Sequence, residues 1–164
     1  MSEYKQTTLC YLTKGEDILF IIKGNTGKNL QNMNAGKYLG VGGHMEDGEA
    51  PYECAFREIF EETGIEKHDI KDMKLKGVAT FINDMCDNEM MYIYKGEYIS
   101  DKDPCPGNCD EGVLTWVNKK QLNTIPVWEG DREIFRLLFA EETDRIFEIK
   151  LIYHGNDLVR VETC

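Results

Sequence analysis

The sequence is short of basic side chains, which number 19 against 30 acidic ones and leave a formal net charge of −11 over 164 residues. A protein that binds a nucleic acid mainly through the phosphate backbone needs a basic surface, so this composition argues against a nucleic-acid polymer as partner. A small phosphorylated ligand stays compatible with the charge only if a metal ion or a few well-placed bases offset it.

Long apolar runs are lacking as well. No run approaches the roughly 20 residues of a membrane-spanning helix, and the start, MSEYKQTTLC, has no apolar core of the kind that signal peptides carry. We therefore expect a cytoplasmic protein with no membrane partner. Hydrophobic residues still make up 41% of the chain, which is enough for the core of a single domain over residues 1–164.

Cysteine occurs six times, but not in the pattern of a disulfide framework or a complete metal site. Without a secretory signal we expect reduced thiols. Cys105 and Cys109, in the segment CPGNC, have the spacing of half a zinc site, but no second pair of Cys or His completes it. The more ordinary interpretation is a loop with incidental thiols.

Patterns of β-forming and helical residues predict a mixed α+β domain without internal repeats. A polar, Gly- and Asn-rich stretch over residues 24–37 predicts a long loop, and loops of that length often bind ligands. The sequence predicts strands at 7–12, 18–22, 37–43, 74–82, 90–99 and 112–117, and a closing hairpin over 145–162.

Two helices are expected. Pro51 fits only the first turn of a helix and Gly64 suits the position after its end, which predicts a helix from about Glu49 to Thr63. Apolar residues at helical spacing predict a second helix over Asp131 to Glu142.

Three glutamates, Glu58, Glu61 and Glu62, share one face of the first helix because i+3 and i+4 spacings relate them. Like charges at the negative end of the helix dipole destabilise the helix, and a bound divalent cation would reverse that effect. Hard cations such as Mg²⁺ take carboxylate oxygens and share them with substrate phosphates. For these three residues alone, a solvated acidic face is an equally good interpretation. The neighbouring arc of the helix, which we expect to pack on the sheet, is apolar: Tyr52, Ala55, Phe56 and Ile59.

The spacing around the glutamates is more specific than the glutamates themselves. From Gly43 to Ile65 the chain reads GHMEDGEAPYECAFREIFEETGI, which follows G-x5-E-x7-R-E-U-x-E-E-x-G-U without a missing position, where U is a bulky aliphatic residue. This stretch resembles the signature box of the Nudix hydrolases. The resemblance implies the Nudix fold, an α/β/α sandwich with a mixed β-sheet, and the predicted order of strands and helices agrees with it.

The resemblance also implies a chemistry and a set of site residues. Nudix hydrolases split a nucleoside diphosphate linked to another group by attack of water on phosphorus, with Mg²⁺ or Mn²⁺ as cofactor. Carried over by position, the metal ligands would be the backbone carbonyl of Gly42 and the side chains of Glu58, Glu61 and Glu62. Glu58 is also the candidate base. Arg57 and Glu49 would pair and hold the glutamates in place, Gly43 would form the tight loop, and Glu111 resembles the extra glutamate that some members bring to the metals.

The segment after residue 112 resembles the MutT-type branch, which destroys oxidised purine nucleoside triphosphates. Trp128 and Asp131 match an aromatic plate and a carboxylate that would bind the edge of a base. Tyr38 and Leu39, however, stand where the mammalian enzyme of this branch has Trp-Asn, and Leu39 cannot form a hydrogen bond to a base. Three further candidates remain. Lys23 would bind a phosphate, although it is equally explained as an exposed lysine at the end of a strand. Phe81 and Met90 would form the wall of the pocket, although both are equally explained as core residues.

Three functions remain open from the sequence. The first is a Mg²⁺-dependent pyrophosphohydrolase of purine nucleoside triphosphates. The second is a Nudix hydrolase of another nucleoside diphosphate derivative, such as ADP-ribose, a nucleotide sugar or a dinucleotide. The third is a non-catalytic Nudix-like domain that binds a nucleotide as a sensor, against which the complete set of glutamates argues. In each case the partner is a small nucleotide, and the oligomeric state is left open.

Overall fold

The computed structural model describes residues 3–24, 33–104, 112–140 and 144–164, so the predicted ligand Glu111 and the thiols of Cys105 and Cys109 lie outside the described residues. Within these ranges the chain forms eight strands and two α-helices. In chain order they are β1 (Tyr4–Lys14), β2 (Asp17–Lys23), β3 (Tyr38–Leu39), α1 (Pro51–Thr63), β4 (Ile70–Asn83), β5 (Asn88–Tyr98), β6 (Gly112–Asn118), α2 (Glu129–Leu138), β7 (Phe147–His154) and β8 (Asp157–Thr163). Each predicted strand is present, although the one expected over 37–43 is reduced to Tyr38–Leu39, and no helix in the described ranges is long and apolar enough to cross a membrane.

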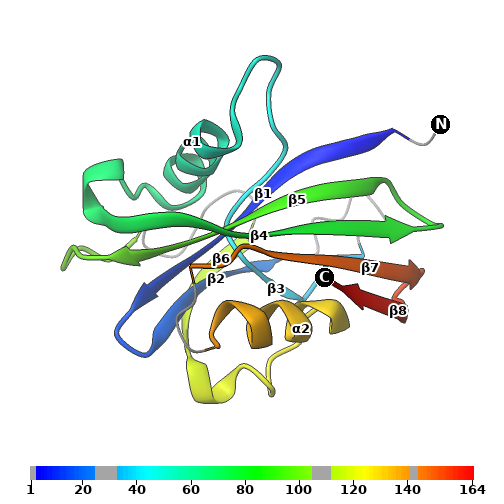
Figure 1. Ribbon diagram of the computed structural model, residues 1–164. Coiled ribbons are helices and arrows are strands. Elements are labelled where there is room, and N and C mark those ends of the chain that lie inside the picture. The colour runs from blue at the N-terminus through cyan, green and yellow to red at the C-terminus, as the bar shows by residue number, and fades with distance from the viewer. Residues whose placement is uncertain (1–2, 25–32, 105–111, 141–143) are drawn as a thin grey trace.

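The strands form one curled, mixed sheet in the order β3-β2-β1-β5-β4-β7-β8, with β6 paired to β2. The pairs β1–β5 and β4–β7 are parallel and the other pairs are antiparallel. Helix α1 lies on one side of the sheet and α2 on the other (Figure 1). The expected α/β/α sandwich with a mixed β-sheet is therefore confirmed.

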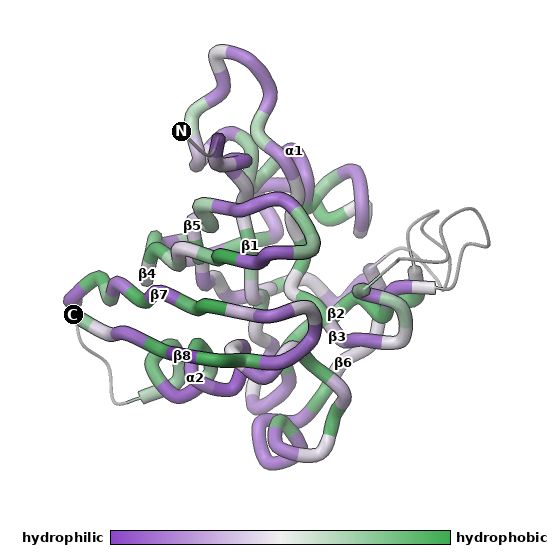
Figure 2. The backbone as a smooth tube through the Cα atoms, turned by 90° about the vertical axis from the view of Figure 1, so that its right-hand side faces the viewer, coloured by the Kyte–Doolittle hydropathy of each residue, from purple (hydrophilic) through white to green (hydrophobic). Residues whose placement is uncertain are grey.

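Alternation along the strands divides the core between the two faces of the sheet. On β1, the Tyr11 side chain packs in the cluster that includes Ile134 of α2, whereas Leu12 packs in the cluster that includes Ile59 of α1. Hydrophobic residues are interspersed with hydrophilic ones along β1 and β7 (Figure 2). Each helix thus covers one set of apolar side chains from the same strands.

Helix α1 begins at Pro51, two residues later than predicted. The Ala50 backbone N–H donates to the Glu53 carboxylate at 2.8 Å, which caps the first turn. At the other end Gly64 adopts φ 70°, a left-handed conformation that favours glycine, and its N–H donates to the Phe60 carbonyl at 2.8 Å. The predicted stop at Gly64 is confirmed.

The buried side of α1 differs from the predicted arc. Ala55 and Ile59 are fully buried as expected, but Tyr52 is 43% exposed. The helix is rotated so that Cys54 and Glu62 join the buried side, which a sequence pattern of apolar residues alone does not indicate. One of the three predicted metal ligands therefore lies in the packed interior.

Helix α2 starts at Glu129, two residues before the predicted Asp131, and ends at Leu138. Asp131 therefore lies in its first turn, where its backbone N–H donates to the Trp128 carbonyl at 2.9 Å. This places the side chains of Trp128 and Asp131 at the end of the helix that faces the sheet.

The loop before α1 runs along β1 as if it were another strand. The Thr8 N–H donates to the Gly43 carbonyl at 2.9 Å, and the Cys10 N–H donates to the Val41 carbonyl at 2.7 Å. A Cβ at Gly42 would lie 1.9 Å from the Thr8 carbonyl oxygen, so only glycine allows this approach. Because successive carbonyls of an extended chain point in opposite directions, the Gly42 carbonyl faces away from β1.

Candidate active site

Arg57 connects the loop to the helix at the centre of the box. Its Nε and Nη2 donate to the two oxygens of Glu49 at 2.7 and 3.0 Å, a bidentate pair. Nη2 also donates to the His44 carbonyl at 3.0 Å. Nη1 donates to Glu58 at 2.9 Å and to Glu61 at 3.2 Å, so one side chain holds two of the predicted ligands.

The pair of Arg57 and Glu49 is well shielded, with side chains 22% and 11% exposed. The hydrogen bond from Arg57 is the main cause that lowers the pKa of Glu49 to about 2, and the Glu46 backbone N–H adds to it. The same contacts raise the pKa of Arg57 above its ordinary value. Both groups therefore stay charged at neutral pH, and the loop is held to the helix by an ion pair.

Glu58 reaches from α1 toward a cavity on the other side of the sheet, and its path depends on Gly43. A Cβ at Gly43 would lie 2.6 Å from the Glu58 carboxyl carbon, so the carboxylate rests directly against the backbone of the loop. The side chain of Glu58 is 13% exposed, and it lines the cavity together with Gly43.

The other two glutamates lie in different environments. Glu62 is 4% exposed; the pKa of the nearby Cys10 thiol is raised mainly by burial, and the charge of Glu62 adds to this shift. The side chain of Glu61 is 56% exposed. The predicted trio thus spans the full range from interior to surface.

The donor set fits a hard divalent cation in its chemistry. Carboxylate oxygens and a backbone carbonyl are the ligands that Mg²⁺ takes, and Glu58 and Glu61 both reach the same guanidinium nitrogen, so their oxygens are close neighbours. Within the described ranges, no three His, Cys, Asp or Glu side chains converge as they stand on a single metal position. In this arrangement the guanidinium of Arg57 binds two of the predicted ligands, Glu58 and Glu61.

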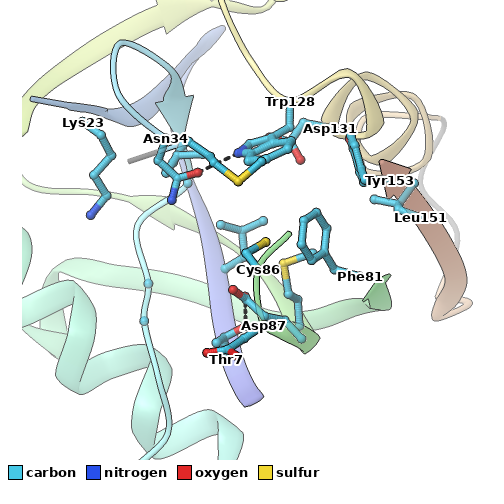
Figure 3. Close-up of a pocket in the computed structure, with 18 of the residues that line it drawn as sticks. Thr7, Lys23, Asn34, Phe81, Cys86, Asp87, Trp128, Asp131, Leu151 and Tyr153 are labelled. Carbon is cyan, nitrogen blue, oxygen red and sulfur yellow. Dashed lines mark hydrogen bonds between the residues drawn. The ribbon is translucent and has the colours of Figure 1, made fainter. Parts of the chain in front are cut away.

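A cavity of about 1530 Å³ extends from Glu58 to the first turn of α2. Figure 3 shows Trp128 and Asp131 on one side of it and Thr7 on the other, with Phe81 between them. Five predicted substrate contacts line this cavity along with Glu58: Lys23, Leu39, Phe81, Trp128 and Asp131. Gly43 lines it as well.

Two predicted contacts do not line the cavity. The Tyr38 ring packs edge-on against Phe20 at 6.2 Å between centroids and belongs to the core. Met90 lies on the opposite face of β5, where the Thr80 hydroxyl lies 3.8 Å from its sulfur. Met91 lines the cavity in its place, because neighbouring side chains of a strand point to opposite faces.

The aromatic end of the cavity is rigidly held. The Trp128 indole Nε1–H donates to the Asn34 side-chain oxygen at 2.7 Å. The rings of Phe81 and Tyr153 meet that of Trp128 at centroid distances of 5.6 and 5.1 Å in edge-to-face geometry. The Lys37 ammonium lies 4.4 Å from the Trp128 ring centroid. Sequence reasoning missed Asn34 and Lys37, although both lie in the Gly/Asn-rich segment that predicted a binding loop.

Asp131 lies beside Trp128 and is 7% exposed. Burial raises the pKa of its carboxyl to about 7, while the nearby charges of Arg132 and Lys37 oppose the shift. The carboxyl is thus poised to change charge near neutral pH, in a position that faces the cavity.

Two polar side chains of the cavity floor were also missed, Thr7 on β1 and Glu89 on β5. The Thr7 hydroxyl donates to Glu89 Oε2 at 3.1 Å. Burial raises the pKa of Glu89, and the hydrogen bond from Thr7 and the nearby His44 oppose that effect. Nothing in the local sequence marks these two residues, because the pairing of β1 with β5 brings them together.

Comparison with known proteins adds a family and a fold. The family model of the NUDIX domain matches residues 3–138. The chain is 29% identical over 143 residues to the uncharacterized Nudix hydrolase YvcI of Bacillus subtilis (strain 168), covering 82% of this chain and 78% of that protein. It superimposes on the mMutator MutT protein of Bacillus halodurans with a TM-score of 0.77 and 25% identity, covering 97% of each chain.

A more distant solved structure shares the fold alone. It is the bifunctional NMN adenylyltransferase/ADP ribose pyrophosphatase of Francisella tularensis, with a TM-score of 0.63 and 17% identity over 86% of this chain and 42% of that one.

Proposed function

The chain belongs to the NUDIX domain family and is a Nudix hydrolase, and from this premise we propose that it is a Mg²⁺-dependent pyrophosphohydrolase of purine nucleoside triphosphates. Oxidised purines such as that of 8-oxo-dGTP are included, and the products are the nucleoside monophosphate and pyrophosphate. One observation carries the proposal: a single cavity joins Glu58 of the box to the aromatic end with Trp128 and Asp131. Membership of a hydrolase family argues against a domain that only binds a nucleotide.

At the box end, Glu58, Glu61, Glu62 and the Gly42 carbonyl would hold the cation, with Glu111 as a further ligand. A cation held there would neutralise charge on the phosphate oxygens and lower the pKa of a water bound to it. Arg57 holds Glu58 and Glu61 in position through hydrogen bonds of 2.9 and 3.2 Å. Glu58, which lines the cavity, orients the attacking water and accepts its proton.

At the other end, the Trp128 ring offers a flat surface on which a purine stacks, and Asp131 binds the edge of the base. Leu39 supplies an apolar wall without a hydrogen bond. Lys23 at the end of β2 lines the same cavity, and its ammonium would meet a phosphate. The nucleotide would therefore lie across the floor of the cavity, with its phosphates at the box.

A substrate panel with Mg²⁺ and detection of pyrophosphate tests the proposal. We expect purine nucleoside triphosphates to release pyrophosphate with higher kcat/KM than pyrimidine triphosphates. Cleavage of ADP-ribose or a nucleotide sugar without any pyrophosphate release from triphosphates would overturn it in favour of the second hydrolase class.

The ligand assignment has its own test in Glu62→Gln. The variant loses one charged ligand of the cation that stabilises the transition state. We expect kcat to fall by roughly 100-fold or more and the circular dichroism spectrum to stay unchanged. Glu66→Gln is the matched control, because Glu66 is exposed beyond the end of α1, where its carboxylate lies beside the exposed His68. Unchanged turnover of Glu62→Gln would remove Glu62 from the ligand set.

A further inference from the structure

Glu89 is a partly buried carboxylate on the cavity floor that the proposed reaction does not use. It lines the cavity from β5, and the hydroxyl of Thr7 holds one of its two oxygens, Oε2, at 3.1 Å. Withdrawing a carboxylate from water is costly unless hydrogen-bond donors replace the water. A ligand that fills the cavity and displaces water should therefore offer a hydrogen-bond donor to the second oxygen of Glu89, Oε1.

Strand pairing fixes where Glu89 lies along the cavity. On its β4 side Glu89 is paired with Phe81, whose ring contacts that of Trp128 at 5.6 Å. On its β1 side it is bound by Thr7, which in turn is bridged to His44, the residue after Gly43. Glu89 thus stands between the aromatic end and the box, about one strand spacing from either neighbour.

A nucleotide bound as proposed would place its sugar over this middle section. A carboxylate repels phosphate oxygens unless a cation bridges the two, and Glu89 is not among the carboxylates that Arg57 binds at the box, so Glu89 does not serve the phosphate end. It is also separated from Trp128 by Phe81 and does not reach the stacked face of the base. Sugar hydroxyls are the donors that remain, and an ionised carboxylate is a strong acceptor for them.

We propose that Glu89 is a specificity-determining residue that accepts a hydrogen bond from a hydroxyl group of the nucleotide sugar. The proposal rests on the proposed function for the direction in which the nucleotide lies. The site would then prefer substrates whose sugar carries the contacted hydroxyl group, in addition to any preference for the base.

Three purine nucleoside triphosphates that differ only in the sugar test this: the ribonucleotide, the 2′-deoxynucleotide and the 2′,3′-dideoxynucleotide. For the wild-type protein we expect kcat/KM to fall by roughly 10-fold or more at the step that removes the contacted hydroxyl, the size of a hydrogen bond to a charged group. The loss should appear in KM rather than in kcat, because the sugar is bound equally in the ground and transition states.

Glu89→Leu should reduce that preference to about twofold or less while activity on the dideoxynucleotide changes little. Glu89→Gln, which keeps a carbonyl acceptor, should retain part of the preference and also serves if the leucine variant folds poorly. Glu97→Gln is the matched control, because Glu97 is an exposed carboxylate on the same strand, is not among the residues that line the cavity, and should keep the wild-type preference when replaced.

An equal loss on all three substrates in both Glu89 variants would overturn the proposal in favour of a structural role. A wild-type protein that treats the three sugars alike would overturn it too. Binding of the three corresponding nucleoside monophosphates, measured by calorimetry, needs no turnover. If no triphosphate is cleaved but this binding shows the same dependence on Glu89, the proposed function fails and the role of Glu89 stands.

Discussion

Arg57 is the residue on which the shape of the box depends. It joins Glu49, Glu58, Glu61 and the His44 carbonyl, so its loss releases the loop from the helix. Because the pair with Glu49 is shielded but not fully buried, Arg57→Ala should lower the free energy of unfolding by roughly 2 kcal/mol, between the values of exposed and buried ion pairs. Arg136→Ala is the control, since its pair with Glu133 is exposed.

The ion pair of Arg57 and Glu49 should also make the free energy of unfolding depend on pH. The pKa of Glu49 is lowered to about 2 in the folded state from an ordinary value of 4.5. A depressed carboxyl pKa contributes stability above the unfolded value, and this contribution is lost as the pH falls toward 2. Urea denaturation between pH 7 and pH 2 should show the wild type and Arg57→Ala converging. An undiminished difference near pH 2 would attribute the effect to packing of the arginine side chain.

The raised pKa of Asp131 predicts that the preference for guanine over adenine changes with pH. Its pKa of about 7 means that the carboxyl is mostly neutral at pH 6 and mostly ionised at pH 8. The ionised form accepts the two N–H groups of a guanine edge, whereas the neutral form donates to adenine N1. We expect the ratio of kcat/KM for dGTP over dATP to rise several-fold across this range, and Asp131→Asn to abolish the rise.

Burial raises the pKa of Asp131 in the folded state, so folding favours the neutral carboxyl. The stability that this contributes is complete below about pH 4 and is lost as the pH rises through 7. Asp131→Asn removes that loss. A variant whose base preference still changes with pH as in the wild type would exclude Asp131 as the group that reads the base.

At the scale of elements, the segment before α1 combines two close approaches with different consequences. Gly42 lies against the backbone of β1, which cannot move aside, and Gly43 lies against the flexible Glu58 carboxylate. Gly42→Ala should therefore destabilise the fold by several kcal/mol, on the order of 3 or more.

Gly43→Ala should instead displace Glu58 and lower kcat by roughly 10-fold or more with little change in melting temperature. Thermal unfolding and kinetics of the two variants, measured together, separate the effects. Similar melting temperatures for both would contradict the backbone contact at Gly42, and full activity of Gly43→Ala would contradict the path assigned to Glu58.

At the scale of the whole molecule, the net charge of −11 means that a bound cation should stabilise the folded state in addition to assisting the reaction. A ligand that binds only the folded state at 100 times its Kd adds about 2.7 kcal/mol, which for a chain of this size raises Tm by roughly 2–4 °C per kcal/mol. Mg²⁺ should therefore raise Tm well beyond NaCl of equal ionic strength, and Glu62→Gln should lose most of this difference. An equal shift with NaCl would mean general screening of charge.

Much of this architecture could be predicted from the sequence because it depends on neighbours along the chain. Pro51 and Gly64 bound α1 through local backbone preferences, and the spacing from Gly43 to Ile65 identified the family. The strands followed from β-forming runs between turns. The bidentate pair of Arg57 and Glu49, eight residues apart, was also predicted from the resemblance and is present in the structure.

The remaining features depend on which side of an element faces which neighbour. The sequence predicts Met90 in the cavity wall, but Met91 lines the cavity, because neighbouring residues of β5 point to opposite faces of the sheet. The sequence predicts that Tyr52 packs on the sheet, but Tyr52 is exposed and Cys54 and Glu62 are buried instead, because contact with the sheet decides the rotation of α1. The roles of the glutamates and of Asp131 stay predictions until they are measured.

The sequence by itself therefore determined the family, the order of the elements and the composition of the box, since these follow from local preferences and fixed spacing. Only the tertiary structure decided that Glu58 passes Gly43 into the cavity, that Asn34 and Lys37 hold Trp128, and that Glu89 stands between the two ends. The reason is physical: these contacts join segments distant in the chain, and strand pairing and helix rotation bring them together only when the whole core is packed.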